Sequence, residues 1–327
     1  MATDAPPFEF LWIVKESAYS TPKTSPTAGV DSIYIRLAGA NRFTPRPVPT
    51  KRKIQFGGGF QVPGYAVYDQ WQITGTLEVE LCYSQALLLL SWAGVRINSA
   101  QTSPWTTTEP IADLASCACY HATARSDDGS IKRRVYLGTK VHSWKITCNA
   151  QSGLAMLSLT LMSQKMQGNT YDSSSDPTSG AFPAPADTAF PTDPVLLLQS
   201  TVNVASTALT YVTGFEFTAT NAMDPLYFAG SPWIGFDRLR GRESSLSLDL
   251  LYTASPDWRT QYEALTSEAV TVVATNSVKT ITIDMKSDNL VDTLSDNLSP
   301  GKVYMQAVTF QNQYDTTNSA DIAITVA

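Results

Sequence analysis

Residues 72–83 read Gln-Ile-Thr-Gly-Thr-Leu-Glu-Val-Glu-Leu-Cys-Tyr, and residues 244–252 read Ser-Ser-Leu-Ser-Leu-Asp-Leu-Leu-Tyr. In both stretches apolar and polar side chains alternate, which is typical of a β-strand with one face in a core and one face in polar surroundings. Superposing Leu77 on Leu246 also aligns the following apolar residues, which are Val79 with Leu248, Leu81 with Leu250 and Tyr83 with Tyr252. The sequence therefore predicts two similar β units in one chain.

Two further matches support this repeat. Residues 140–147 (Lys-Val-His-Ser-Trp-Lys-Ile-Thr) resemble residues 302–309 (Lys-Val-Tyr-Met-Gln-Ala-Val-Thr). Residues 125–128 (Arg-Ser-Asp-Asp) resemble residues 286–289 (Lys-Ser-Asp-Asn). Three matches in the same order indicate a tandem duplication rather than a solenoid or propeller, whose repeats are only about 20–50 residues long.

The composition fits a two-domain chain. The 327 residues are 43% hydrophobic, which is enough for two cores, and only 16% are charged. Residues 1–165 hold 16 Lys and Arg against 11 Asp and Glu, whereas residues 166–327 hold 7 against 18. Opposite charges on the two halves could attract neighbouring copies, or the difference could serve solubility alone.

Proline- and serine-rich stretches divide the chain into four parts. We expect an N-terminal arm at 1–30, a first β domain at 31–165, a linker at 166–194 and a second β domain at 195–327. Each domain has alternating segments for about six to eight strands. The predicted class is all-β, with two tandem β-sandwich or half-barrel domains and extended loops.

Each predicted domain also carries one short α-helix. The first is expected at Gln85–Ala93, between a capping Ser84 and Gly94. The second is expected to open at 255–257 and to run to about Leu265. A hairpin is expected from the strands at 135–147 and 154–162.

Two long excursions interrupt the predicted strands, at 41–63 and at 221–242. Such lengths are uncommon in a compact domain unless the segment has a role. The first excursion contains five basic residues, Arg42, Arg46, Lys51, Arg52 and Lys53. They could be solvated surface charges, contacts to an acidic partner surface, or contacts to nucleic acid.

Residues suited to catalysis or metal binding are few. The only histidines, His121 and His142, lie inside strand patterns, and the four cysteines include no C-x-x-C pair. Cys117 and Cys119 share one strand face without further soft ligands. No G-x-S-x-G motif is present. The sequence therefore predicts no enzymatic activity, no cofactor and no metal.

Targeting signals are also missing from the sequence pattern. The first ten residues lack a basic region followed by an apolar core, so we expect no signal peptide. The longest apolar run, Ala86–Leu90, is too short to span a bilayer. We expect cysteines in a reducing compartment and no membrane partner.

Two segments resemble a known family. Glu16-Ser17-Ala18-Tyr19-Ser20-Thr21-Pro22 resembles the Glu-x-x-Tyr-Gly-Thr-Pro stretch of long-tailed, siphovirus-like bacteriophage tail tube proteins, with Ser20 in place of the usual glycine. The segment 136–146, Tyr-Leu-Gly-Thr-Lys-Val-His-Ser-Trp-Lys-Ile, is similar to the core of the same family. The resemblance covers residues 9–165 well and the second half weakly.

This resemblance implies a β-sandwich whose inner sheet joins those of its neighbours into a ring. Rings stack helically into a tube in the virion tail, assembled in the host cytoplasm with other tail proteins. Genomic DNA passes through the lumen without specific binding during ejection. A chain with two copies of the unit would close a ring as a trimer with pseudo-six-fold symmetry, or as a hexamer if one copy lies outside.

On this reading several residues acquire roles. Glu78, Glu80 and Asp249 are expected to face the lumen, although Glu78 and Glu80 also fit an ordinary exposed strand face. The five basic residues of the first excursion are expected to contact the adjacent ring. The alternatives are another β-sandwich tail component, such as a terminator, baseplate or host-binding protein, and a carbohydrate hydrolase, which needs two facing carboxylates.

Overall fold

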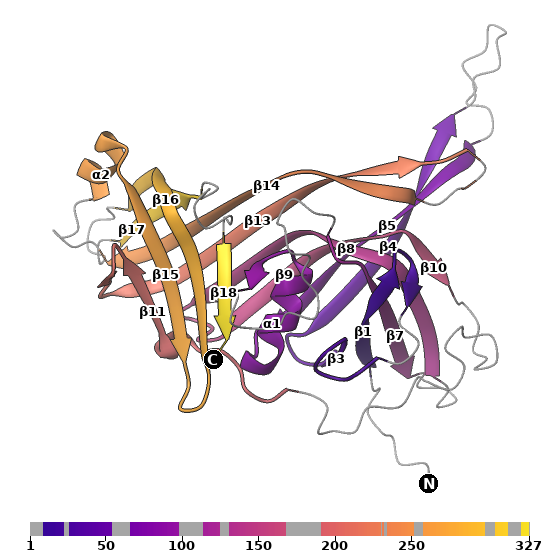
Figure 1. The fold of residues 1–327 in the computed structure, drawn as a ribbon, viewed down its shortest axis with the longest axis horizontal. Helices are drawn as coiled ribbons and strands as arrows, with labels where there is room; N and C mark the ends of the chain where they lie inside the picture. Colours follow the sequence, from indigo (N-terminus) through magenta and orange to yellow (C-terminus); the bar gives the residue numbers. More distant parts are fainter. Residues whose placement is uncertain are drawn as a thin grey trace, which may run out of the picture.

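The computed structural model describes residues 9–22, 26–53, 66–97, 114–124, 131–167, 191–229, 231, 234–251, 258–297, 305–312 and 322–326. Within them β-strands predominate, together with two α-helices, α1 (Tyr83–Trp92) and α2 (Trp258–Ala264). The predicted all-β class is confirmed. The first half of the chain lies at one end of the molecule and most of the second half at the other (Figure 1).

The first half forms two sheets around a common core. Its inner sheet has the order β4 (Arg42–Lys53), β5 (Ala66–Glu80), β9 (Ala155–Ser163) and the C-terminal part of β8 (Ile131–Asn149). Its outer sheet has the order β3 (Ser32–Arg36), β1 (Glu9–Ala18), β7 (Cys117–Ala124), the N-terminal part of β8 and β10 (Lys165–Gln167), with β2 (Thr21–Pro22) beside β1. A bulge in β8 between Val141 and Ser143 marks the change of sheet.

The second half repeats this pairing pattern. Its inner sheet has the order β13 (Val212–Tyr227), β14 (Ile234–Leu251), β17 (Met305–Gln311) and the C-terminal part of β16 (Thr280–Asn297). Its outer sheet has the order β12 (Thr207–Ala208), β11 (Ser200–Val204), β15 (Ser267–Thr275), the N-terminal part of β16 and β18 (Ile322–Val326), which also pairs with β6 (Arg96–Ile97). A short 3₁₀ turn, η3 (Leu197–Gln199), precedes β11.

The paired residues show which strands correspond. Leu77 lies between Phe43 and Leu159 in the first inner sheet. Leu246 lies in the same way between Phe217 and Phe310 in the second. The match between residues 72–83 and 244–252 is therefore confirmed, and β4, β5, β9 and β8 correspond to β13, β14, β17 and β16.

Of the two other sequence matches, that of residues 140–147 with residues 302–309 is wrong, and that of residues 125–128 with residues 286–289 stays untested. Residues 140–147 lie in β8, whose counterpart is β16, whereas residues 305–309 belong to β17, the counterpart of β9. Residues 286–289 lie within β16, and residues 125–128 lie outside the described residues, beyond the end of β7. Alternation of period two gives the face of a residue but not its neighbouring strand, so strands that do not correspond can be aligned.

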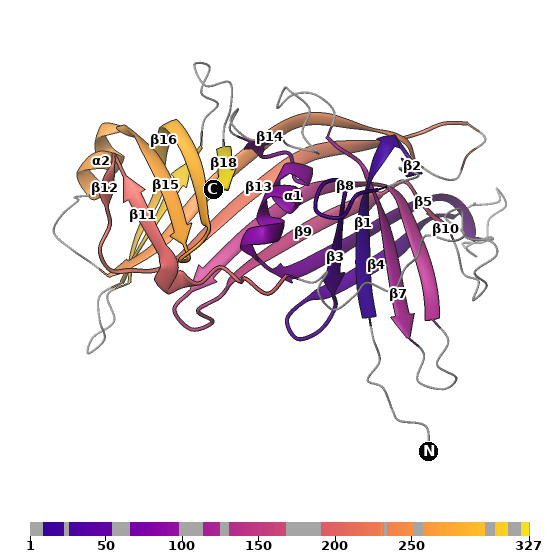
Figure 2. The same cartoon turned by 60° about the horizontal axis from the view of Figure 1, so that its bottom comes forward.

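One strand pair joins the two halves, and we call it the seam. β8 pairs antiparallel with β13 from Asn149 opposite Gly214 to Ser143 opposite Thr220, which makes a continuous inner sheet of eight strands (Figures 1 and 2). On its core face Ile146 lies opposite Phe217 and Trp144 opposite Ala219, all buried. A large residue facing a small one fills this space without a void.

Helix α1 is held by residues from the linker and from the second half. At its first turn, the Ser84 amide and hydroxyl donate to the Asp193 carboxylate, at 3.1 and 2.6 Å. At its C-terminal end, the Asn221 side chain on β13 donates to the carbonyl groups of Ala93 (3.1 Å) and Val141 (3.0 Å). Backbone groups that a helix end leaves unpaired are thus satisfied from outside the first unit.

Residues 9–18 differ from the expected arm, because they form a central strand of the outer sheet. Both faces of β1 are apolar and buried, with Leu11 and Ile13 on one side and Phe10 and Trp12 on the other. The linker segment 168–190 and residues 1–8 lie outside the described residues. The described parts of both predicted excursions belong to long antiparallel strand pairs, β4–β5 and β13–β14, whose paired ends project on the same side of the molecule (Figures 1 and 2). Residues 54–63 of the first excursion lie outside the described residues.

Replacing Asn221 by Ala tests how strongly the seam holds α1. The variant leaves two buried carbonyl groups without a donor, so we expect the free energy of unfolding to fall by about 2–3 kcal/mol in urea denaturation. The matched control is Asn203→Ala, which removes one longer hydrogen bond, 3.3 Å to Thr271 Oγ1, at a partly buried position. The control should lose less than about 1 kcal/mol, and equal losses would contradict the role of Asn221.

Candidate functional site

The face of the inner sheet that points away from the core is covered by hydroxyl side chains. One row across the sheet runs through Thr44, Thr76, Thr160, Ser143 and Thr220, each opposite the next. Residues directly opposite each other in an antiparallel pair share a face, so this row crosses the seam without changing sides. We call this surface the polar face.

Hydrogen bonds on the polar face recur in the two halves. Thr44 Oγ1 lies 2.6 Å from Thr76 Oγ1, and the corresponding pair, Thr218 Oγ1 and Ser245 Oγ, is 2.8 Å apart. A third hydroxyl pair joins Ser247 and Thr309 at 2.9 Å. Short, uncharged side chains that bond to each other thus recur at equivalent places of the polar face.

The charged residues of the polar face are mainly acidic. Glu78 and Asp249 are exposed and Glu80 is half-buried, and the ladder places all three on this face. Lys145 and Glu216 form an ion pair across the seam at 2.7 Å, and Arg42 lies directly opposite Glu78. Lys145 and Arg42 thus have acidic neighbours, whereas Arg46 lies opposite Thr74, and a small acidic excess remains on this face.

The predicted basic contacts fall on one strand. Arg42 and Arg46 are exposed on the polar face near the start of β4. Lys51, Arg52 and Lys53 form the far end of β4, where they pair with Tyr68, Val67 and Ala66. The structure therefore separates the five residues into two positions, one on the sheet and one towards the tip of the hairpin.

Sequence reasoning missed the two edges of the eight-stranded sheet. In the part of the chain that the structure describes, no strand pairs with the outer side of β4 or with the outer side of the C-terminal part of β16. Prolines at 45, 47 and 49 in β4 are the signal that could have shown an edge, because proline cannot donate to a ladder and is confined to edge strands. Such edges recruit further strands.

Nucleophilic and metal-binding groups are buried or paired. His121 contacts the Glu9 carboxylate, and burial lowers the pKa of its imidazole. Cys117 and Cys119 share the core face, as expected, and burial raises the pKa of both thiols well above the ordinary value. Among the described residues, no cluster of three or more His, Cys, Asp or Glu could hold a metal ion.

The two segments that carry the sequence resemblance meet in the structure. The buried Glu16 carboxylate accepts hydrogen bonds from the amides of Ser20 and Gly138, both at 2.8 Å. The ammonium group of buried Lys140 lies 4.8 Å from the centre of the Tyr19 ring. Burial raises the pKa of the Glu16 carboxyl, although these amides, Ser116 and Lys140 act in the opposite direction.

A comparison with protein families decides what this architecture is. A family model described as phage tail tube protein matches residues 9–326. The chain belongs to the phage tail tube protein family. A search of curated proteins gave no match. The protein is therefore a structural component of a phage tail, and the match extends through both halves rather than the first alone.

The backbone at Ser20 of this tail tube protein suits glycine, the residue that stands there in the motif this segment resembles. Ser20 adopts a φ of 63°, a left-handed conformation that glycine enters without strain. Its hydroxyl is buried without a hydrogen-bond partner. No helix among the described residues is both long and apolar enough to cross a membrane.

Replacing Ser20 by glycine should stabilise the tail tube protein. Ser20→Gly relieves the left-handed strain and removes an unsatisfied hydroxyl, so we expect the free energy of unfolding to rise by about 0.5–1 kcal/mol in thermal or urea denaturation. Ser17→Gly, in the extended part of β1, is the matched control and should lower it by a similar amount. A loss of stability in both variants would contradict the strain at Ser20.

Proposed function

We propose that the protein forms the tail tube by closing rings of three copies, which stack around a lumen for the phage genome. The observation that carries this proposal is the seam. Strand β8 of the first unit pairs with β13 of the second, and the counterparts of these two strands, β16 and β4, are the edges left unpaired among the described residues. The same contact made between copies joins β16 of one copy to β4 of the next.

The seam supplies the register for this contact. Phe43 corresponds to Phe217, and Leu294 corresponds to Ile146. In each case the residues that lie opposite the two on the neighbouring strand hold equivalent places in the two units. Because Phe217 lies opposite Ile146, Phe43 of one copy would lie opposite Leu294 of its neighbour. On the polar face, Thr44 would lie opposite Thr293 in the same way.

The number of strands in the inner sheet supports ring closure. Each copy contributes eight strands, so three copies give about 24, more than the 16–18 strands of porins that already enclose an aqueous channel. The contact is head-to-tail. Such contacts form closed rings when the rotations between successive copies add up to a full turn. Closure also pairs both exposed edges, which removes a site for uncontrolled strand addition.

The polar face would line the lumen. Duplex DNA carries one negative charge per about 1.7 Å of its axis, so a wall with Glu78, Glu80 and Asp249 repels it rather than binding it. Lys145 is paired with Glu216, and acidic residues outnumber the remaining cations of this face, Arg42 and Arg46. DNA would therefore slide through the tube without specific binding.

A disulfide across the proposed contact tests its register. In Thr44→Cys/Thr293→Cys, we expect oxidation to link three copies covalently, because directly opposite residues have the Cα spacing that a disulfide needs. The matched control is Lys145→Cys/Thr218→Cys, the same positions within the seam, which should close inside one chain. Non-reducing gel electrophoresis and peptide mapping distinguish the two products.

An off-register variant makes the disulfide test specific. Thr44→Cys/Ser295→Cys shifts one partner by two residues on the same face, so it should cross-link much less than Thr44→Cys/Thr293→Cys. Equal yields from the two variants, or no oligomer from either while the seam control closes, would refute the proposed edge pairing.

The tip of the β4–β5 hairpin is proposed to contact the adjacent ring. Replacing Lys51, Arg52 and Lys53 together by Glu should abolish long tubes in negative-stain electron microscopy while the subunits stay folded, because like charges would repel the acidic partner surface. Arg259→Glu, a charge reversal on the exposed helix α2, is the control and should leave tube length unchanged. Normal tubes from the triple variant would refute this contact.

The same micrographs separate the tail tube from the other tail components. Long hollow filaments from the purified protein support the proposed function. Single particles or isolated rings at all concentrations would favour a terminator, baseplate or host-binding role instead.

A further inference from the structure

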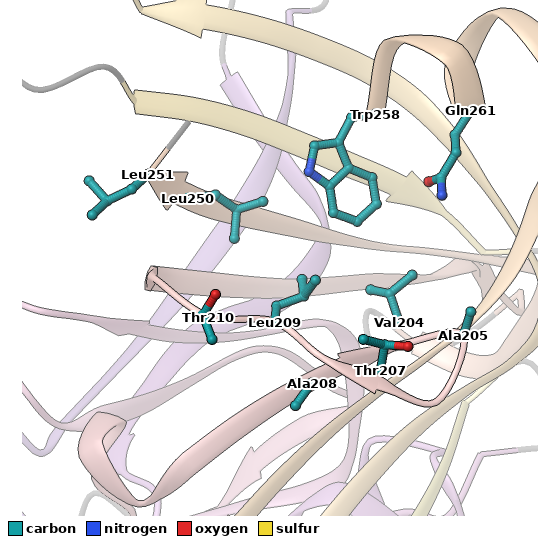
Figure 3. Close-up of a pocket in the computed structure, with 10 residues that line it drawn as sticks. All are labelled: Val204, Ala205, Thr207, Ala208, Leu209, Thr210, Leu250, Leu251, Trp258 and Gln261. Carbon is teal, nitrogen blue, oxygen red and sulfur yellow. The ribbon is translucent and has the colours of Figure 1, made fainter. Parts of the chain in front are cut away.

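Beneath α2 lies a cavity of about 310 Å³ (Figure 3). Its walls come from the β11–β12 hairpin and the residues after it, the end of β14, and α2, and they consist of Val204, Ala205, Thr207, Ala208, Leu209, Thr210, Leu250, Leu251, Trp258 and Gln261. The Trp258 ring points from α2 towards the hairpin (Figure 3). Gln261 Oε1 is buried without a hydrogen-bond partner, so the site offers an acceptor to an incoming N–H group.

The corresponding place in the first unit is covered by the linker. Leu81 and Cys82, the counterparts of Leu250 and Leu251, contact the residues just before β11. The Val195 amide donates to the Leu81 carbonyl at 2.8 Å, and Cys82 pairs with Pro194. The backbone carbonyl of Asp193 accepts from the Tyr83 amide at 3.0 Å.

The Asp193 side chain fixes the linker in this position. Its carboxylate accepts from Ser84 and from Lys279 Nζ, the latter at 2.9 Å on the second unit. Burial alone would raise the pKa of this carboxyl, but the hydrogen bonds from Ser84 and Lys279 and the charge of Lys279 lower it overall. Val195 is buried as a result.

Strand correspondence shows which segment is the equivalent of this linker. Ile13 of β1 lies opposite Cys119 and Val202 of β11 lies opposite Val272, and both ladders end two residues later, at Lys15 and Val204. β1 is therefore the counterpart of β11, with Ile13 in the place of Val202. Counting back from these residues places Thr3-Asp4-Ala5-Pro6-Pro7-Phe8 on Thr192-Asp193-Pro194-Val195-Leu196-Leu197.

The two segments share their chemistry. Both begin with Thr-Asp, and both continue with four apolar residues that lead into the outer-sheet strand. Leu250 already pairs with Val212 and Gln306, and the Leu251 amide donates to the Tyr211 carbonyl at 3.1 Å. The backbone pairing that Val195 makes is therefore not repeated here, which suits proline at position 6, and the apolar side chains of the segment would fill the cavity instead.

We propose that residues 3–8 of a second copy occupy the cavity beneath α2. The inference rests on the proposed function. If β16 pairs with β4 of the next copy, the β1 strand of that copy lies beside the second unit, just as the seam places β11 beside the first unit. Residues 3–8 of the same chain lead into β1, which lies at the opposite end of the molecule from α2 in both views (Figures 1 and 2). The occupant therefore comes from a neighbour.

Mixing two single variants tests this docking in trans. Ala5→Cys protein is combined with Leu251→Cys protein under mild oxidation, since Ala5 replaces Pro194 and Leu251 replaces Cys82 in the proposed contact. We expect a covalent dimer at a yield about tenfold or more above that of Ala5→Cys mixed with Val278→Cys, an exposed turn position away from the cavity. Thr210→Cys, on the exposed rim of the cavity, replaces Leu251→Cys if the latter folds poorly.

The template within the chain provides the positive control. Pro194→Cys should form an intramolecular disulfide with native Cys82, which shows that the geometry permits the bond. If Thr44→Cys/Thr293→Cys links copies and the cavity variants do not, the N-terminal docking is overturned while the ring stands. If the cavity variants link and the edge variants do not, the docking stands and the edge pairing is overturned.

Discussion

The architecture depends on one antiparallel contact, the seam between β8 and β13. It buries Trp144, Ile146 and Phe217, and full burial of a large apolar side chain contributes about 1.5–3 kcal/mol. The seam also positions Asn221 under the end of α1, so the helix of the first unit is completed by the second. Each unit is therefore incomplete without a neighbour on this side, and the chain supplies that neighbour only once.

Charge distinguishes the internal seam from the contact proposed between copies. In the seam, Glu216 pairs with Lys145. The counterpart of Glu216 on β4 is Arg42, which would meet Lys145 with a like charge if β4 took the place of β13. Such repulsion raises the free energy of the wrong strand pairing and leaves the right one unaffected, which makes the pairing specific. The proline residues of β4 act in the same sense, because they restrict what the edge can pair with.

The two faces of the inner sheet have separate tasks. The core face consists of apolar residues contributed by both units, while the polar face carries hydroxyl pairs and a small acidic excess. Alternation along each strand keeps these requirements independent, so the wall of the proposed lumen can remain smooth without any change in the core. The outer sheets and α1 cover the core face from the other side.

The sequence by itself determined the all-β class, the correspondence of residues 72–83 with 244–252, and the exposed faces of Glu78 and Asp249, because strand alternation is a local property. It did not determine that residues 9–18 form a sheet strand, that β8 corresponds to β16, or that β8 pairs with β13. β8 changes sheets at a bulge, and its neighbours are far away in the chain. Period-two patterns say which way a side chain points, whereas only the packed tertiary structure decides which strand lies beside it.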